Sequence, residues 1–327
     1  MSQTKVWMNA LGCGAMENRI DLLQIPLDEA PGPRTFWGAL LCLGLLATAG
    51  CANVDEWGRT KVYRPMVISD QQTWQNMLAT RPDVSTLEVP VGDRNERITV
   101  LRVSPAEGAD RESDIRVLYL HGTFRHAFWN LPKTAPMAAV GMTVYVPDYR
   151  GWGVSSPLLP SEASIHEDAL AVWRGLQKLS PQNSNDQPVR WVIYGHSMGS
   201  AVAVALAAGL TAKHAYCALV VESSFTNFSD VAYEAAGLPG RWLVAMGEQR
   251  MDAEALMASV EPPVWSLHGE NDTTVPMRLG QRLFKRAPEP KTWAQWPLGH
   301  SNLHTDPSGR YDQVWRDIRE VCERAPG

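Results

Sequence analysis

The stretch WVIYGHSMGSAVA, residues 191–203, decides the fold of this chain. It opens as a β-rich apolar run and closes as the start of an alanine-rich helix, with Gly-His-Ser-Met-Gly between the two. A strand of the core has no need of two glycines around a histidine and a serine. Where a helix crosses close to the strand before it, the residues at the crossing must be small. The stretch therefore predicts a sharp strand-to-helix turn, with Ser197 at its tip between Gly195 and Gly199.

Apolar strands and helices alternate along the chain around this turn. A hairpin is expected at 85–91 and 97–103. Further strands are expected at 115–122, 142–149, 189–195, 217–224, 263–269 and 292–297, and helices at 166–179, 198–210, 278–286 and 312–323. Strands that are apolar on both faces indicate a parallel sheet covered on both sides by helices. The sequence thus predicts an α/β fold with a mostly parallel sheet.

The composition is that of an ordinary globular protein, with 45% hydrophobic and 20% charged residues. The net charge is −5 and no run of basic residues occurs, which argues against a nucleic-acid partner. The five cysteines match no metal-binding spacing. Cys217 opens a predicted buried strand and Cys322 falls in the last predicted helix, so we expect two buried free thiols rather than a disulfide.

The first 50 residues have the features of a leader. An apolar run of 14 residues, 36–49, is shorter than the roughly 20 residues that cross a bilayer and is typical of a signal-peptide core. Small residues directly before Cys51 resemble a bacterial lipobox, in which the cysteine becomes the lipidated N-terminus. Thr48 and the long acidic leader depart from that pattern. We expect an exported, membrane-anchored lipoprotein of a bacterial cell envelope; a periplasmic or secreted form and an uncleaved anchor are the alternatives.

Polar residues gather where the predicted parallel strands end. In open sheets of this kind, functional groups lie at the carboxyl ends of the strands. Four motifs occupy such ends: YLHGT (119–123), GHSMG (195–199), HGENDTTVP (268–276) and GHSN (299–302). Gly-x-Ser-x-Gly between a strand and a helix is the nucleophile elbow, which lifts the serine Oγ above the sheet. A serine hydroxyl becomes an effective nucleophile when a histidine takes its proton and an acid orients that histidine.

These motifs resemble those of the α/β-hydrolase superfamily of serine hydrolases, from about residue 84 to the end of the chain. PDYRGWGVS (147–155) and ESSF (222–225) add to the resemblance. Within the superfamily, the chain is most similar to the compact membrane-associated hydrolases related to the fungal bud-emergence proteins. The resemblance implies the α/β-hydrolase fold, Ser197 as nucleophile, Asp272 as acid and His300 as base, with no metal and no cofactor.

Two members of this triad have competitors in the sequence. Glu222 ends the strand after the elbow helix and is the alternative acid. His304 is the alternative base if the last loop is shifted.

The site also needs an oxyanion hole, made by two N–H donors aimed at the developing charge. The elbow supplies the N–H of Met198, and the resemblance implies the N–H of Thr123 as the second donor. Phe124 and Arg125 are the alternatives to Thr123.

The resemblance divides the chain into a leader at 1–50, a tether with an edge element at 51–83, and a catalytic domain at 84–327. A short cap insertion is expected at about 226–262, which predicts an open or lightly covered site. Trp152, Trp242 and Leu243 are the candidate substrate-binding residues. Trp242, Leu243 and Met246 lie at helical spacing and form either an acyl-chain or membrane-facing wall or part of the core.

The expected function is that of a serine hydrolase, which cleaves carboxylic esters or thioesters of acyl groups through an acyl-enzyme. The expected partners are a small-molecule acyl substrate and a membrane surface. A serine peptidase or amidase of the same fold is an alternative, because the triad does not recognise the leaving group. A relative that only binds a ligand is the alternative from another class.

Overall fold

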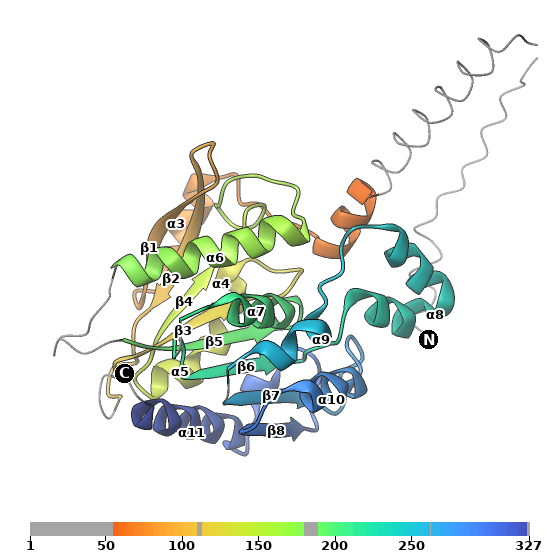
Figure 1. Ribbon diagram of the computed structural model, residues 1–327. Coiled ribbons are helices and arrows are strands. Elements are labelled where there is room, and N and C mark those ends of the chain that lie inside the picture. The colour runs from red at the N-terminus through yellow and green to blue at the C-terminus, as the bar shows by residue number, and fades with distance from the viewer. Residues whose placement is uncertain (1–54, 110–112, 180–188, 213, 262, 326–327) are drawn as a thin grey trace, which may run out of the picture. The chain divides into compact units, whose positions relative to one another are not determined.

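The computed structural model describes residues 55–109, 113–179, 189–212, 214–261 and 263–325 (Figure 1). The chain divides into two compact units, Met1–Gly50 and Cys51–Gly327, and the described residues all belong to the second. The predicted leader and Cys51 lie outside the described residues. Among the helices that are described, none has the length and apolar character needed to cross a membrane.

An eight-stranded sheet forms the centre of the second unit, with the order β1-β2-β4-β3-β5-β6-β7-β8. Its strands are β1 (Val84–Val91), β2 (Glu96–Val103), β3 (Ile115–Leu120), β4 (Thr143–Pro147), β5 (Arg190–His196), β6 (Ala218–Glu222), β7 (Val264–Gly269) and β8 (Lys291–Trp296). β1 and β2 form the predicted antiparallel hairpin, β2 pairs antiparallel with β4, and all other pairs are parallel. The prediction of a mostly parallel sheet is therefore confirmed.

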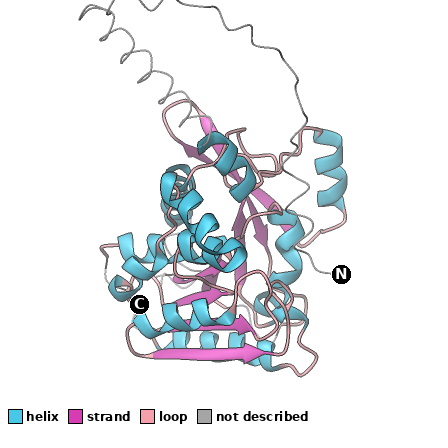
Figure 2. Cartoon of the chain, turned by 90° about the vertical axis from the view of Figure 1, so that its right-hand side faces the viewer, coloured by secondary structure: helices cyan, strands magenta, loops and turns pink. Residues whose placement is uncertain are grey.

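Helices cover both faces of this sheet, as the fold class predicts (Figures 1 and 2). One apolar core lies between the sheet and α6 (Glu162–Leu179), α7 (Met198–Gly209) and α10 (Met277–Arg286). A second core lies between the opposite face and α3 (Gln71–Ala79), α5 (Ala135–Ala139) and α11 (Arg310–Arg324). The shorter elements are α4 (Ala127–Asn130), η1 (Leu131–Thr134), α9 (Ala253–Leu256), η2 (Met257–Ser259) and η3 (Leu303–Thr305).

The segment before β1, expected as a tether with an edge element, packs on the sheet domain over its described residues. Residues 55–63 are helical, and the side chain of Tyr63 at the end of this helix is fully buried. Its hydroxyl donates to Oε1 of Gln249 at 2.7 Å. Trp74 of α3 is also buried and lies edge-on to Phe128 of α4. Two large aromatic side chains thus hold the segment on the domain, since burial of each contributes about 2–3 kcal/mol.

Cys217 and Cys322 form a disulfide, so the expectation of two free thiols is wrong. Cys217 directly precedes β6 and Cys322 lies in the last turn of α11, and their Cα atoms are 5.1 Å apart. That separation falls within the range that a disulfide spans. The two residues are 105 positions apart in the sequence, so only the tertiary fold brings them together.

The segment predicted to be a cap insertion holds α8 (Phe228–Met246), which consists of two helical stretches joined by a kink, followed by α9. α8 bends at Gly237, whose φ of 63° and ψ of −152° are not helical. Its exposed side chains include Trp242 at 69% and Leu243 at 44%, so core packing of these two residues is ruled out.

Candidate active site

The turn between β5 and α7 holds Ser197 in a conformation that few L-residues adopt, with φ of 55° and ψ of −124°. Glycine is required on both sides of this turn. A Cβ at Gly195 would lie 2.2 Å from the carbonyl oxygen of Gly199, and a Cβ at Gly199 would lie 1.9 Å from that of Leu120. The N–H of Ser197 donates to the carbonyl of Glu222 at 2.9 Å. The predicted elbow is thus present, and it turns the serine toward the carboxyl edge of the sheet.

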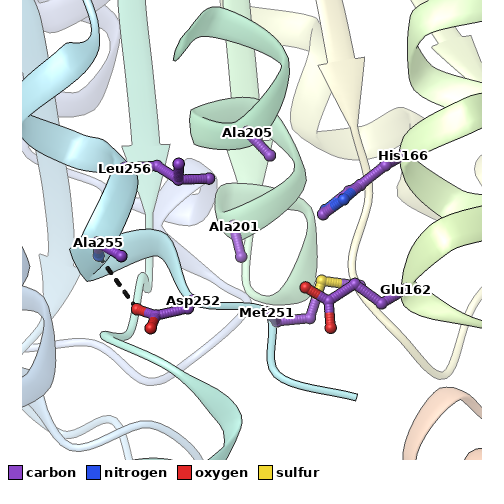
Figure 3. Close-up of a pocket in the computed structure, with 8 residues that line it drawn as sticks. All are labelled: Glu162, His166, Ala201, Ala205, Met251, Asp252, Ala255 and Leu256. Atoms are coloured by element: carbon purple, nitrogen blue, oxygen red, sulfur yellow. Dashed lines mark hydrogen bonds between the residues drawn. The ribbon is translucent and has the colours of Figure 1, made fainter. Parts of the chain in front are cut away.

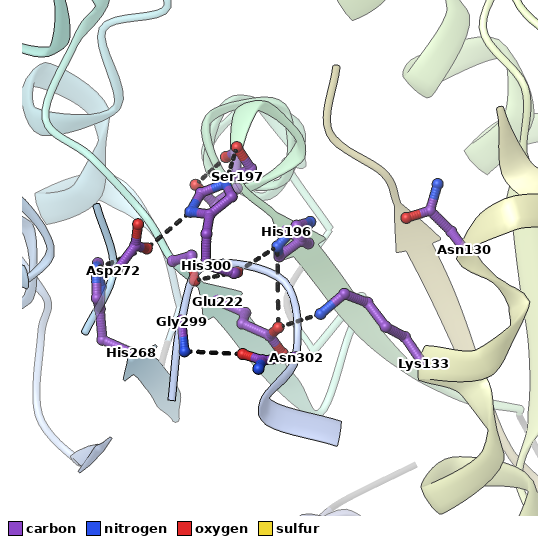
Figure 4. Close-up of polar contacts among 12 residues, drawn as sticks. Asn130, Lys133, His196, Ser197, Glu222, His268, Asp272, Gly299, His300 and Asn302 are labelled. Atoms are coloured by element: carbon purple, nitrogen blue, oxygen red, sulfur yellow. Dashed lines mark hydrogen bonds and ion pairs between the residues drawn. The ribbon is translucent and has the colours of Figure 1, made fainter. Parts of the chain in front are cut away.

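The structure brings Ser197, His300 and Asp272 into a continuous line of hydrogen bonds (Figure 4). His300 Nε2 lies 2.9 Å from Ser197 Oγ, and His300 Nδ1 lies 2.7 Å from Asp272 Oδ2. Asp272 comes from the loop after β7, and His300 from the loop after β8. In this geometry the imidazole can accept the serine proton on Nε2 while the carboxylate fixes the Nδ1–H tautomer.

Asp272 is held as an ionised acceptor. Its other oxygen accepts hydrogen bonds from the backbone N–H groups of Thr274 at 2.9 Å and Val275 at 2.8 Å. Burial raises the pKa of the Asp272 carboxyl, but the imidazoles of His268 and His300 and the Val275 N–H outweigh burial and hold that pKa well below its usual range. A carboxylate that stays ionised can support the imidazolium formed when His300 takes a proton.

The loop that carries His300 is fixed through its own backbone. The carbonyl oxygen of His300 accepts hydrogen bonds from His196 Nε2 and from Ser223 Oγ, each at 2.9 Å. Burial and the nearby Lys133 ammonium hold the pKa of His196 well below its usual value, so its ring is neutral and donates from Nε2. His196 is the second residue of Gly-x-Ser-x-Gly. The elbow therefore holds the loop of His300 as well as Ser197.

The loop after β3 lies directly against Ser197. A Cβ at Gly122 would lie 3.0 Å from Ser197 Cβ and 3.5 Å from its Oγ. The backbone N–H groups of Thr123 and Met198 donate to no acceptor within the described part of the chain. Two free donors next to a nucleophile fit an oxyanion hole, although the role of Thr123 and Met198 stays a prediction.

Glu222, the alternative acid, is engaged elsewhere. Its Oε1 lies 2.5 Å from Lys133 Nζ, and its Oε2 accepts from the hydroxyls of Tyr194 and Tyr311 at 2.7 Å each. Burial alone would raise the pKa of Glu222, but the Lys133 ammonium and these hydrogen bonds lower it to about 2. Since His300 Nδ1 is bonded to Asp272, the geometry favours Asp272 over Glu222 as the acid.

The sequence model of the alpha/beta hydrolase family matches residues 117–322, which is more than half of the chain and contains all three residues of the hydrogen-bonded line. The chain belongs to the alpha/beta hydrolase family.

Several known proteins are similar to this alpha/beta hydrolase. The lysophosphatidylserine lipase ABHD12 of Danio rerio is 31% identical over 191 residues, which are 54% of this chain and 48% of that protein. The protein Rv2307c of Mycobacterium tuberculosis is 35% identical over 165 residues, 50% of this chain and 54% of that protein. The chain thus spans about half the length of the curated relatives that it matches.

Solved structures show the same fold at low sequence identity. An alpha-beta hydrolase of Vibrio vulnificus superposes with a TM-score of 0.61 at 18% identity, covering 79% of this chain and 91% of that one. The esterase Pf2001 of Pyrococcus furiosus superposes with a TM-score of 0.59 at 19% identity, covering 81% of this chain and 98% of that one. At these identities the likeness concerns the fold alone.

The predicted substrate-binding residues of this alpha/beta hydrolase do not gather in one pocket. Trp152 is fully buried beside Tyr149 and His121, so the expectation that it lines a substrate pocket is wrong. Its ring instead fixes the loop that follows β4. Trp242 and Leu243 are exposed on α8. His304, the alternative base, is half-buried, and neither Ser197 nor Asp272 is among its hydrogen-bond partners in the described structure.

A small hollow in this alpha/beta hydrolase lies between α6, α7 and α9 (Figure 3). The side chains around it are mostly apolar and none belongs to the triad: Glu162, His166, Ala201, Ala205, Met251, Asp252, Ala255 and Leu256. Because Ser197 is absent from its lining, we assign this hollow no role in the chemistry.

Sequence reasoning missed Lys133 as a partner in the site. It sits in η1, within the sequence LPKTAP, and its side chain is 4% exposed. A single lysine between two prolines carries no pattern that predicts burial. The only available signal was Glu222 at the end of a buried strand, which requires a cation or several donors nearby.

Proposed function

We propose that this protein is a serine hydrolase that cleaves carboxylic esters or thioesters of acyl groups through an acyl-enzyme. The observation that carries the proposal is the hydrogen-bonded line Ser197–His300–Asp272 on a strained elbow. His300 Nε2 takes the proton from Ser197 Oγ as that oxygen attacks the acyl carbonyl. The carbonyl oxygen becomes negative, and the N–H groups of Met198 and Thr123 stabilise it.

The tetrahedral adduct then collapses to the acyl-enzyme. The bond from the acyl carbon to the leaving alcohol or thiol breaks, and the proton on His300 passes to that leaving group. A water molecule enters, gives a proton to His300 and attacks the acyl group, which releases the acid and restores Ser197. Every proton in this cycle passes through His300 Nε2, so the chemistry calls for no metal and no cofactor.

The comparisons support acyl esters as the substrate class. The relatives include a lysophosphatidylserine lipase, so lysophospholipids belong among the substrates to test. A peptidase or amidase would use the same triad, and no observation on the site favours either. A purely ligand-binding role is less consistent with a triad whose hydrogen bonds are already formed.

A fluorophosphonate probe tests the nucleophile. We expect the probe to label the wild-type protein, and Ser197→Ala to abolish labelling. Ser85→Ala is the matched control, because Ser85 is an exposed serine on the edge strand β1, and it should label as the wild type does. Labelling that persists in Ser197→Ala would contradict the proposal.

Turnover of graded substrates tests the reaction class. The purified protein is assayed on p-nitrophenyl esters of increasing chain length, on an acyl thioester, on lysophosphatidylserine and on a peptide p-nitroanilide. The proposal is supported if the esters or the thioester are hydrolysed and the peptide p-nitroanilide is not. The reverse ranking would identify an amidase.

We further propose that the protein is exported and anchored to a membrane through lipid on Cys51. The apolar run at 36–49 and the small residues before Cys51 support this proposal. The Cys217–Cys322 disulfide also supports export, since structural disulfides persist in oxidising compartments. Labelled palmitate should be incorporated by the wild-type protein and lost in Cys51→Ser. A mature protein without lipid, whose N-terminus is another residue, would refute the anchor.

A further inference from the structure

The cap helix α8 turns its apolar side chains outward. It has 19 residues, all of them described, and buries only Asp230 among them. Leu238, Trp242 and Met246 follow one another at a spacing of four residues, so they form one row along the helix. They are 62%, 69% and 70% exposed. A surface helix normally turns such a row toward the core, and this row, called the α8 row below, does the reverse.

Charged groups hold the first half of α8, before the kink at Gly237, to the domain. Arg282 Nη1 lies 3.0 Å from Asp230 Oδ2, which also accepts from Thr226 Oγ1 at 2.7 Å. Arg278 forms an ion pair with Glu234. The helix is therefore attached by polar contacts, and these leave the α8 row free.

The N-terminal helix at 55–63 touches both ends of α8. The ring of Tyr63 lies 6.1 Å from that of Phe228 at the start of α8. Asp55 accepts from Gln249 Nε2 at 3.5 Å, just beyond the end of α8. Three residues separate Asp55 from Cys51, the proposed site of the lipid, and the four extended steps between these two Cα atoms span at most roughly 14 Å. A membrane that holds the lipid on Cys51 must then lie near Asp55.

We propose that the α8 row docks on a lipid bilayer, entering the region between the head groups and the acyl chains. Trp is enriched at that depth, and an amphipathic helix there buries its apolar face roughly 5–10 Å deep. The row spans about 12 Å along the helix, so it can lie flat on such a surface. The inference rests on the membrane attachment proposed above and is independent of the proposed chemistry.

Docking through this row would bring the catalytic edge close to lipid. α8 begins five residues after the end of β6, and the carbonyl of Glu222 at that end binds the N–H of Ser197. The helix thus leaves the sheet at the same carboxyl edge as the nucleophile.

Quenching by brominated lipid tests the contact directly. The full chain is reconstituted in vesicles of phosphatidylcholine and phosphatidylglycerol, with ordinary or brominated acyl chains. We expect brominated lipid to quench a smaller part of the tryptophan fluorescence in Trp242→Ser than in the wild type. The quenched part should stay at the wild-type value in Trp265→Phe, because Trp265 is buried at 8% exposure. An equal loss of emission in Trp242→Ser and the wild type would overturn the proposal.

Kinetics on two forms of substrate separate docking from chemistry. Leu238→Ser/Met246→Ser should lower turnover of an ester embedded in vesicles by about tenfold or more, which is the effect of losing one well-buried side chain. It should leave turnover of a soluble short-chain ester within about twofold. The control is Leu179→Ser, since Leu179 is exposed at 60% on α6.

The other outcomes each count against docking. Equal loss on both substrates would place the effect in the site or the fold. If brominated lipid does not quench Trp242, and if replacing Trp242 abolishes self-association of the protein, the α8 row binds a second copy of the chain. A wild-type protein that fails to join the vesicles would refute the attachment as well, whereas one that attaches with Trp242 unquenched refutes docking alone. A wild type that is inactive on soluble esters would contradict the proposed function and leave the quenching result valid.

Discussion

Lys133→Met is expected to lower the free energy of unfolding by about 3–5 kcal/mol, because it leaves a buried carboxylate without its cation. The side chain of Glu222 is fully buried and that of Lys133 is 4% exposed. The two lie 2.5 Å apart beneath the elbow. Removing one partner of such a pair leaves the other charge buried without a counter-ion. A charge in the protein interior costs far more free energy than a charge in water.

The pKa of Glu222 gives an independent magnitude. It falls from 4.5 to about 2 in the folded protein, and each pKa unit is worth about 1.4 kcal/mol, so the ionised form gains about 3 kcal/mol. Tyr194 and Tyr311 still donate to Glu222 after the substitution. We therefore expect a loss near the lower end of the range.

The dependence of stability on pH follows from the same lowering of the pKa of Glu222. Because the folded pKa of Glu222 is below its unfolded value, its contribution is fully present above about pH 4.5 and is lost as the pH falls toward about 2. In Lys133→Met this dependence should weaken or reverse, because burial then raises the pKa of Glu222 in the folded state.

Urea unfolding followed by circular dichroism at pH 7 and pH 4 measures both effects. Lys178→Met is the matched control, because Lys178 is exposed on α6, and it should change the free energy of unfolding by less than about 0.5 kcal/mol. The double variant Lys133→Met/Glu222→Gln should lose less than the sum of the single variants. A loss below about 1 kcal/mol in Lys133→Met, or additive single losses, would refute the reasoning.

Three further predictions concern the elbow, the acid and the disulfide. Asp272→Asn should lower kcat by about 10⁴-fold with the fold intact, because the amide favours the wrong imidazole tautomer; a loss below about tenfold in ester assays would contradict this. Gly199→Ala should prevent recovery of folded protein, because the new Cβ meets backbone, while Gly209→Ala, which meets nothing within 4 Å, should keep its unfolding temperature or raise it. Cys217→Ser/Cys322→Ser should lower the free energy of unfolding by about 2–5 kcal/mol in urea titrations, and an unchanged midpoint would show that the bond adds no stability.

Local pattern was sufficient for most of the sheet and for the elbow. The alternation of apolar strands with helices predicted the order of elements, and the small residues around Ser197 follow from a 1.9 Å clash that any Cβ at Gly199 would meet. Ser197, Asp272 and His300 were named as a triad by the resemblance to the α/β-hydrolase superfamily, and each of them follows a different strand of one parallel sheet. Strand ends that are distant in sequence must converge at one edge.

The features that sequence did not predict depend on tertiary contacts. Cys217 and Cys322 are 105 residues apart, and their pairing requires knowing that α11 returns beside β6. The burial of Lys133 depends on Glu222, which is 89 positions further along the chain. Trp152 resembled a pocket residue because large aromatic side chains serve equally well in cores, and only its neighbours distinguish the two uses.

The disulfide has a consequence for how the protein would survive cleavage. The segment between Cys217 and Cys322 contains Asp272, His300 and the exposed helix α8, whereas Ser197 lies before it. A protease that cut α8 would produce two fragments, one with the nucleophile and one with the acid and the base. The bond between the two cysteines would keep these fragments in a single molecule. The covalent link therefore joins the part of the chain with Ser197 to the part with Asp272 and His300, across the exposed helix α8.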